Sequence, residues 1–198
     1  MTSQLLINTI FQLIIFTLIP FLWWFFSARK SEKFLIWIGL IKPEFNNSKT
    51  LILSVLAIII MLLLGIFLTN TFEDSSVLAS YQFSELGFGG IIPVLIYAFF
   101  QTGLSEEILF RGFLGKRLSH KFGFTVGNIV QSVLFGLVHG VLLFGNVPIS
   151  LVILVVVLTS AFGWLMGYLN EKMGNGSIIP SWIIHGLVNT ISAFLVLF

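Results

Sequence analysis

Five ionisable side chains lie within or directly beside long apolar stretches of the sequence. They are Glu106, Glu107, Arg111, His139 and His185. A charged group inside a membrane-spanning helix costs roughly 3 to more than 10 kcal/mol, so each one requires a partner or a function. Carboxylates and imidazoles are also the side chains that most often move protons in enzymes. This set therefore indicates proton-transfer chemistry within a membrane.

Helical spacing separates the two adjacent glutamates. At about 100° per residue, Arg111 lies about 40° around the helix from Glu107 but about 140° from Glu106. We therefore expect Glu107 and Arg111 to form an i, i+4 ion pair, with Glu106 facing elsewhere without that partner. The simpler interpretation is a structural ion pair with Glu106 reaching to the membrane surface, and it leaves the histidines unexplained.

Two more residue pairs have the spacing of one helix face. Phe135 precedes His139 by four residues, and His185 precedes Asn189 by four. An aromatic ring at Phe135 can pack against the imidazole of His139, and Asn189 can point the same way as His185. A single membrane histidine is often only a hydrogen-bonding residue between helices, but two of them near an unpaired glutamate favour a site.

The depth of these residues follows from a predicted hairpin at about Lys121 to Gly123. Glu106 precedes Phe122 by 16 residues and His139 follows it by 17. At about 1.5 Å per residue, both lie on the order of 25 Å from the turn and hence at one level. This prediction requires the helix of Glu106 to continue beyond Arg111 to about His120.

Two mechanisms fit these residue types. In the first, Glu106 and His139 hold and deprotonate a water, while His185 and Asn189 donate hydrogen bonds to the developing oxyanion. In the second, Glu106, His139 and His185 bind a metal ion such as zinc, and Glu107 is the nearest spare base. The sequence contains no HExxH motif, no cysteine and no aspartate within an apolar stretch, and no Ser/His/Asp relay is evident. Zincin, thiolate, aspartyl and serine mechanisms are therefore excluded.

The elements that must position this set are membrane spans. Of the 198 residues, 57% are apolar and only 9% are charged, which exceeds the apolar content of a water-soluble domain. A spanning helix needs about 20 mostly apolar residues. The sequence predicts an all-α, polytopic transmembrane helical bundle of about six spanning helices, with residues 1–198 forming a single membrane domain. The predicted spans are 4–26, 50–69, 91–110 with an extension, 124–144, 149–169 and 178–197.

The basic residues sort to one side of this topology. The loops after the first, third and fifth spans contain all ten of them: Arg29, Lys30, Lys33, Lys42 and Lys49, then Arg111, Lys116, Arg117 and Lys121, then Lys172. The loop at 70–90 contains only Glu73, Asp74 and Glu85. The positive-inside rule then predicts cytoplasmic basic loops, external termini and an active site that opens toward the cytoplasm. The net charge of +2 is too small to indicate a nucleic-acid partner.

The motif order Glu106-Glu107-x-x-x-Arg111, Phe135-x-x-x-His139 and His185-x-x-x-Asn189 resembles the CPBP family of intramembrane proteases, also called the ABI family. That family includes type II CAAX prenyl endopeptidases and bacterial proteins linked to bacteriocin processing and self-immunity. The resemblance spans Glu106 to Asn189, which favours a catalytic core over 91–197 and accessory spans over 1–90.

The resemblance implies an intramembrane endopeptidase, here of a bacterial cell membrane, that cleaves a peptide or protein at or in the lipid. Glu106 is its implied base and His139 its water-holding partner, with His185 and Asn189 stabilising the oxyanion. Glu107 and Arg111 are its implied structural support. Many members are described as metalloproteases, so zinc and a metal-free glutamate mechanism remain rival expectations.

Two other classes of protein use similar residues. A membrane transporter or non-catalytic immunity protein can use buried Glu and His as a proton or ion relay, and glycine-broken helices around the Glu would favour it. A b-type haem protein can use His139 and His185 as axial ligands, but it leaves Glu106 without a role.

Overall fold

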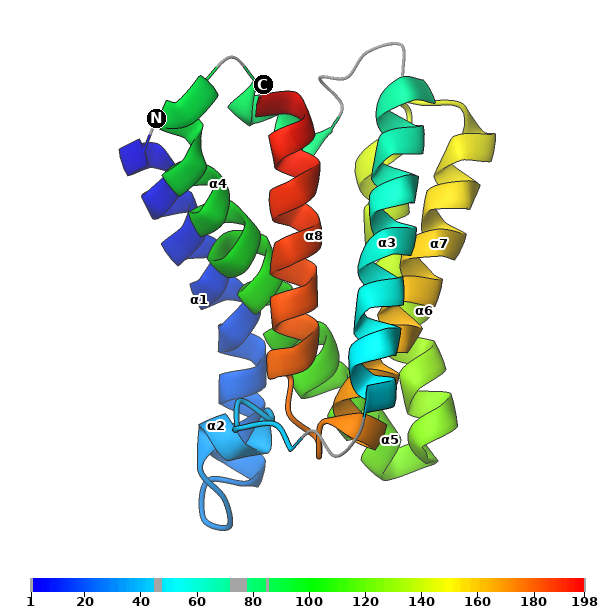
Figure 1. Cartoon of the computed structure of the whole chain (residues 1–198). Coiled ribbons are helices and arrows are strands. Elements are labelled where there is room, and N and C mark those ends of the chain that lie inside the picture. Colours follow the sequence, from blue (N-terminus) through cyan, green and yellow to red (C-terminus); the bar gives the residue numbers. More distant parts are fainter. Residues whose placement is uncertain (1, 45–47, 72–77, 85, 198) are drawn as a thin grey trace.

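In a computed structural model, the chain forms a bundle of helices that confirms the predicted all-α membrane architecture (Figure 1). The structure describes residues 2–44, 48–71, 78–84 and 86–197. Within them, six helices are long and apolar enough to cross a membrane. They are α1 (Thr2–Ser27), α3 (Ser48–Thr71), the third span that begins with α4 (Ile91–Ile96), α6 (Phe124–Leu143), α7 (Ile149–Tyr168) and α8 (Ile179–Leu197).

The third span is one uninterrupted helix that reaches beyond Arg111, as the depth argument required. It runs from α4 through the π-helical segments η4 (Tyr97–Leu104) and η5 (Glu107–Gly115) into α5 (Lys116–Phe122). Regular α spacing was expected throughout this span, whereas η4 and η5 have wider π turns. Hydroxyl groups satisfy carbonyls along this stretch, since Thr102 donates to the Tyr97 carbonyl and Ser105 to the Gln101 carbonyl. Such side-chain bonds allow a membrane helix to depart from the α pattern, and π turns are common at functional sites.

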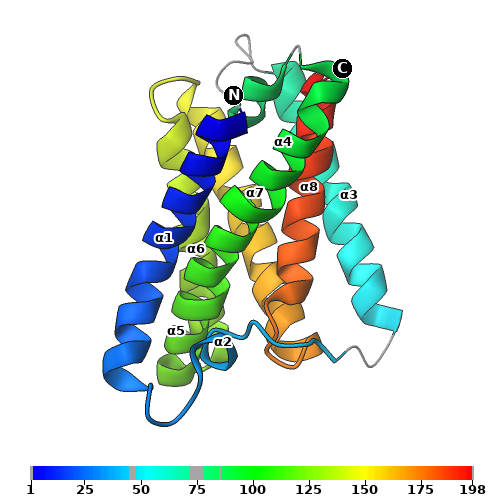
Figure 2. The ribbon, with the colours of Figure 1, turned by 90° about the vertical axis from the view of Figure 1, so that its left-hand side faces the viewer.

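Short elements complete the fold. They are α2 (Phe34–Trp37), the 3-10 turns η2 (Ala79–Phe83) and η3 (Gly87–Gly90), and η6 (Leu169–Met173), which extends α7. The helix α8 lies in the centre, with the third span and α1 on one side and α3 with α7 on the other (Figures 1 and 2). This central position places the residues of α8 between the two halves of the bundle.

Close packing of α6 against α7 rests on glycines. A Cβ added at Gly136 would lie 2.5 Å from the Val156 carbonyl oxygen, and one added at Gly140 would lie 2.3 Å from the Val156 side chain. Small residues let membrane helices approach closely because lipid provides no hydrophobic force between them. The glycine pairs therefore hold His139 of α6 close to the rest of the core.

The burial pattern is that of a protein dissolved in lipid. Large apolar side chains such as Phe11, Ile14 and Ile153 are more than half exposed on the outer surface. The interior, by contrast, contains Glu107, Arg111, Gln131, Asn170 and His185, each less than 5% exposed. Polar groups in a membrane protein face the bundle interior, where they find partners.

The two ends of the bundle differ in charge. Both termini lie at the end opposite α2 and α5 (Figure 1). The basic residues that follow α1 and those within α5 and η6 gather at the α2 and α5 end, as the sequence predicted. Arg111 is a correction, because it is a buried residue of the third span rather than part of a loop. Glu73, Asp74 and Glu85 lie outside the described residues.

Candidate active site

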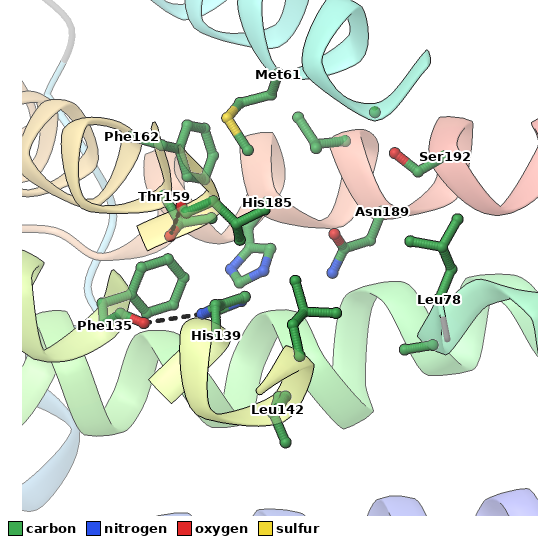
Figure 3. Close-up of a pocket in the computed structure, with 15 residues that line it drawn as sticks. Met61, Leu78, Phe135, His139, Leu142, Thr159, Phe162, His185, Asn189 and Ser192 are labelled. Carbon is green, nitrogen blue, oxygen red and sulfur yellow. Dashed lines mark hydrogen bonds between the residues drawn. The ribbon is translucent and has the colours of Figure 1, made fainter. Parts of the chain in front are cut away.

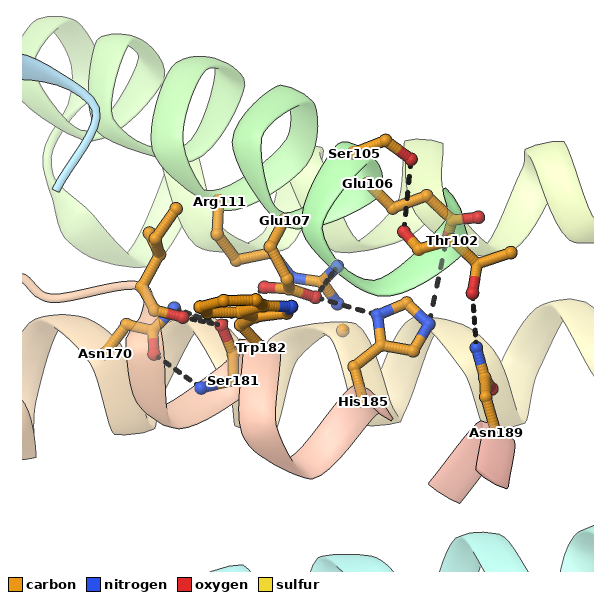
Figure 4. A network of polar contacts seen from close by, with 12 residues as sticks. Thr102, Ser105, Glu106, Glu107, Arg111, Asn170, Ser181, Trp182, His185 and Asn189 are labelled. Carbon is orange, nitrogen blue, oxygen red and sulfur yellow. Dashed lines mark hydrogen bonds and ion pairs between the residues drawn. The ribbon is translucent and has the colours of Figure 1, made fainter. Parts of the chain in front are cut away.

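Glu107 is the centre of a buried polar network between the third span and α8 (Figure 4). Its Oε1 accepts from Arg111 Nη1 at 2.9 Å, and its Oε2 accepts from the Ser181 hydroxyl. Asn170 completes the network by donating from Nδ2 to Ser181 Oγ at 2.7 Å. The predicted ion pair of Glu107 with Arg111 is therefore present. Glu107 is fully buried, and its two oxygens bind Arg111, Ser181 and His185, an arrangement that favours a structural role over that of a spare base.

His185 is held by Glu107. Its Nδ1 lies 3.0 Å from Glu107 Oε1. An ionised carboxylate only accepts hydrogen bonds, so Nδ1 carries the proton and Nε2 is left to face the opposite way. There Nε2 lies 3.8 Å from Glu106 Oε2. The His185 ring is therefore positioned between two carboxylates, one structural and one facing open space.

Glu106 has the unpaired carboxylate that the helical spacing predicts. Its side chain is 17% exposed, and Oε2 is buried without a hydrogen-bond partner among the described residues. Arg111 turns instead to Glu107 and to the Phe135 ring, whose centroid is 4.1 Å from the guanidinium carbon. The carboxylate of Glu106 is thus the ionisable group of this cluster that remains available to a reactant.

His139 is oriented by its own helix. Its Nδ1 donates to the Phe135 carbonyl at 2.8 Å, so its Nε2 is the acceptor in the neutral ring. The Phe135 ring lies 4.5 Å from the His139 ring and 6.0 Å from that of His185, measured between centroids. Phe135 is 2% exposed and contacts Arg111 and both histidines. It therefore fixes their relative positions, as its place one turn before His139 suggested.

Asn189 lies one turn beyond His185 on α8. Its Nδ2 donates to Thr102 Oγ1 at 2.9 Å. A carboxamide nitrogen has two N–H groups, so a second one remains for another acceptor. Figure 3 shows Asn189 beside His185 and His139 along the same wall.

Two adjoining cavities meet at His139, His185 and Asn189. One, of about 450 Å³, also contains Glu106, Gln101 and Gln12 on its wall. The other, of about 260 Å³, is mainly apolar and is lined by Met61, Val155, Phe162 and Val188 (Figure 3). The structure thus brings Glu106, His139, His185 and Asn189 around shared space, although His139 and Glu106 form no ion pair among the described residues.

The cavities extend away from the basic end of the bundle. Beyond the histidines their walls are formed by Ser192, Leu142 and the η2 residues Ala79 and Ser80. Toward the basic end, the fully buried network of Glu107, Ser181 and Asn170 closes the interior. The cavities therefore extend from the histidines toward η2 rather than toward the basic end, and the expectation that the site opens toward the cytoplasm stays a prediction. Counting residues along a helix gives the depth of a side chain in the membrane. It does not show whether the cavity beside that side chain extends toward one membrane face or the other.

The metal hypothesis can be compared with this geometry. Each histidine has Nδ1 bound to an oxygen acceptor and Nε2 free, which is the orientation of metal-ligating histidines. However, no three His, Asp or Glu side chains among the described residues gather closely enough to hold a metal ion. The arrangement of these side chains therefore does not fit a three-ligand zinc site.

Several residues of the buried polar contacts were not predicted from the sequence. Asn170 was placed after the fifth span, but η6 extends that helix and buries it beside Ser181. Gln131 donates to the Gly163 carbonyl between α6 and α7, a contact that the sequence did not predict. Thr102 was not considered. Each is a polar residue within or at the end of an apolar stretch, and that position alone indicates that it needs a hydrogen-bond partner. Which residue is the partner is shown only by the folded structure.

Comparison with known proteins gives one family. No curated protein matches the chain, and no solved structure does. The family model described as type II CAAX prenyl endopeptidase Rce1-like matches residues 88–191. The matched segment contains the whole third span, α6 and α7, and most of α8 with Glu106, His139, His185 and Asn189. The chain belongs to the type II CAAX prenyl endopeptidase Rce1-like family, a family of intramembrane proteases.

Proposed function

We propose that this protein is an intramembrane endopeptidase in which Glu106 activates water. The observation that carries the proposal is the unpartnered Oε2 of Glu106, which faces His185 Nε2 across the cavity that His139 and Asn189 line. A buried carboxylate oxygen without a partner costs free energy. A reactant water and a peptide carbonyl would supply that partner.

The chemistry follows from the ring orientations. A water in the larger cavity donates one hydrogen bond to Glu106 and one to Nε2 of His139, which leaves an oxygen lone pair for attack on the peptide carbonyl carbon. Glu106 takes the water proton as the carbon–oxygen bond forms. The same proton then goes to the nitrogen of the leaving amine as the carbon–nitrogen bond breaks.

Stabilisation of the oxyanion falls to α8. With Nδ1–H bound to Glu107, His185 donates from Nε2 to the oxyanion when both of its ring nitrogens carry a proton. Asn189 adds its free N–H. One such donor is commonly worth about 100- to 1000-fold in kcat.

The continuous third span supports hydrolysis over the transport alternative. Transporters place their sites at broken helices, whereas the helix around Glu106 runs without interruption from Ile91 to Phe122. The substrate class is a peptide or protein segment at or in the membrane. Bacteriocin processing, self-immunity and prenylated peptides are roles suggested by the family resemblance, and a substrate library separates them.

The decisive experiment is cleavage of a peptide library by purified protein in detergent. We expect Glu106→Gln and His139→Gln to lower kcat/KM by at least about 100-fold, which is the usual contribution of general acid–base catalysis. Matched controls are Glu32→Gln and His120→Gln, at exposed positions outside the cavities, and they should retain full activity. Equal cleavage by all variants would remove the assignment. Zinc content and cleavage in a chelator, measured on the same sample, test the metal mechanism.

A further inference from the structure

The helix α1 precedes the family-matched segment, yet it contributes to the wall of the candidate active site. Most of α1 faces lipid with residues such as Ile7, Phe11 and Ile14, each more than half exposed. Toward η4, however, it presents Thr9, which is 5% exposed, and the half-buried Gln12. Polar side chains on a membrane helix require an explanation in each case.

These residues form a ladder of hydrogen bonds with η4 and the residue after it. Gln101 Nε2 donates to Gln12 Oε1 at 3.5 Å, and Gln101 Oε1 lies 3.4 Å from Thr9 Oγ1, whose single proton also has the Leu5 carbonyl at 2.8 Å as an acceptor. Gln12 Nε2 donates to Ser105 Oγ at 3.2 Å, directly beside Glu106. Hydrogen bonds between helices are a common way to join membrane spans, so the ladder alone indicates only packing.

Two of the four ladder residues line the larger cavity and two do not. Thr9 and Ser105 are buried between the helices and do not line it. Gln12 and Gln101 line the cavity of about 450 Å³ together with Glu106. Among the described residues each of these two carboxamides donates one hydrogen bond and accepts at most one. A carboxamide has two N–H groups and two lone pairs on oxygen, so each retains one donor and one acceptor.

A peptide substrate in this cavity needs such groups. Its backbone N–H and C=O groups leave water when it enters a membrane-embedded site, and an unsatisfied backbone group there costs several kcal/mol. The remaining donor and acceptor of a glutamine match the acceptor and donor of one peptide group. We propose that Gln12 and Gln101 bind the backbone of the substrate next to the scissile bond. This inference rests on the proposed endopeptidase function.

The test uses an internally quenched peptide that wild type cleaves in the library assay. In a series of analogues, each backbone amide beside the scissile bond is replaced in turn by an ester, which removes one N–H. At the position bound by a glutamine, wild type should prefer the amide over the ester by roughly 3- to 10-fold in kcat/KM, the value of one hydrogen bond. In Gln12→Leu or Gln101→Leu this preference should fall to about one, with the loss mainly in KM.

Asn8→Leu is the matched control, because Asn8 is an exposed amide on the same helix whose bond among the described residues is with Gln4. It should leave both the activity and the amide preference unchanged. If Gln12→Leu and Gln101→Leu reduce amide and ester cleavage equally, the two residues only pack helices and the inference is overturned. If wild type cleaves no peptide at all, the proposed function itself fails, which is a distinguishable result.

Discussion

Glu106 and Glu107 are adjacent in sequence but lie in opposite electrostatic situations. Glu107 is fully buried with Arg111, Ser181 and His185 as partners, whereas Glu106 retains a free oxygen at the cavity. The helical turn directs the two carboxylates to different surroundings, so Glu107 joins the buried network and Glu106 lines the cavity. Substitutions at the two positions should therefore affect different properties.

Glu107→Gln should destabilise the protein rather than only inactivate it. The change leaves the 2% exposed Arg111 guanidinium without its counter-ion, and removal of one partner of a buried pair costs about 3 to 5 kcal/mol. The free energy of unfolding, measured by thermal or denaturant unfolding in detergent micelles, should fall by that amount. Glu106→Gln should lower it by less than about 1 kcal/mol, because Glu106 has no direct ion pair with Arg111.

The double variant Glu107→Gln/Arg111→Met provides the control. Removing both charges should restore most of the lost stability, since a buried pair replaced by uncharged residues is often close to neutral. Glu107→Gln as stable as wild type would contradict the structural role of this ion pair.

The positions of single helices depend on how closely their backbones can approach one another, as well as on polar pairs between side chains. The helices α6 and α7 lie so close at Gly136 that an added Cβ would come within 2.5 Å of the Val156 carbonyl oxygen. A backbone atom cannot rotate away as a side chain does. The position of His139, one turn from Gly136, therefore depends on a residue that performs no chemistry.

Gly136→Ala should destabilise the protein by about 1 to 3 kcal/mol, the usual cost of overpacking a core. The midpoint of thermal unfolding in detergent measures the effect, and activity should fall as α6 shifts. Gly89→Ala is the matched control, because a Cβ there meets nothing within 4 Å. Equal midpoints for the two variants would show that α6 and α7 have room to separate.

The short helix α2 and the residues after it help to fix the position of α8. The Gly39 carbonyl after it accepts from Ile178 N at 2.8 Å, and the Ile41 carbonyl accepts from Ser177 Oγ. Arg117 adds a cation–π contact of 4.0 Å to Trp37 of α2. The segment after α1 thus holds the beginning of α8, the helix that contains Ser181, His185 and Asn189.

At the scale of the whole molecule, the basic residues lie at one end of the bundle and the cavities extend toward the other. The basic residues gather at the α2 and α5 end, and the cavities extend toward η2. If the basic end is cytoplasmic, as the positive-inside rule predicts, the site is reached from the other face or laterally from that half of the bilayer.

Cysteine labelling can test this orientation directly, because the chain has no native cysteine. In sealed, right-side-out membrane vesicles, a membrane-impermeant maleimide should label Ser80→Cys at the cavity wall. Lys121→Cys at the basic end should react only after the vesicles are opened. Val133→Cys lies on the lipid-facing surface of α6 and should stay unlabelled. It is the control for entry of the maleimide into the bilayer. Labelling of Lys121→Cys in sealed vesicles would reverse the orientation.

Much of this architecture follows from the sequence alone, for a simple physical reason. Hydrocarbon offers no hydrogen bonds, so long apolar stretches must form helices, and their number and approximate ends can be read directly. The same principle made each buried charge noticeable, and local helical spacing sufficed to pair Glu107 with Arg111. These predictions involve neighbours along one helix.

Contacts between helices were decided only by the tertiary structure. The i, i+4 rule cannot find Asn170 beside Ser181 or Gln12 beside Ser105, because those partners are 11 and 93 residues apart. The direction in which the cavities extend likewise depends on how α3, α6, α7 and α8 pack, and no single stretch of sequence encodes that space. Residue type and spacing determined which side chains must be inside, and packing determined which of them meet and which of them remain free to react.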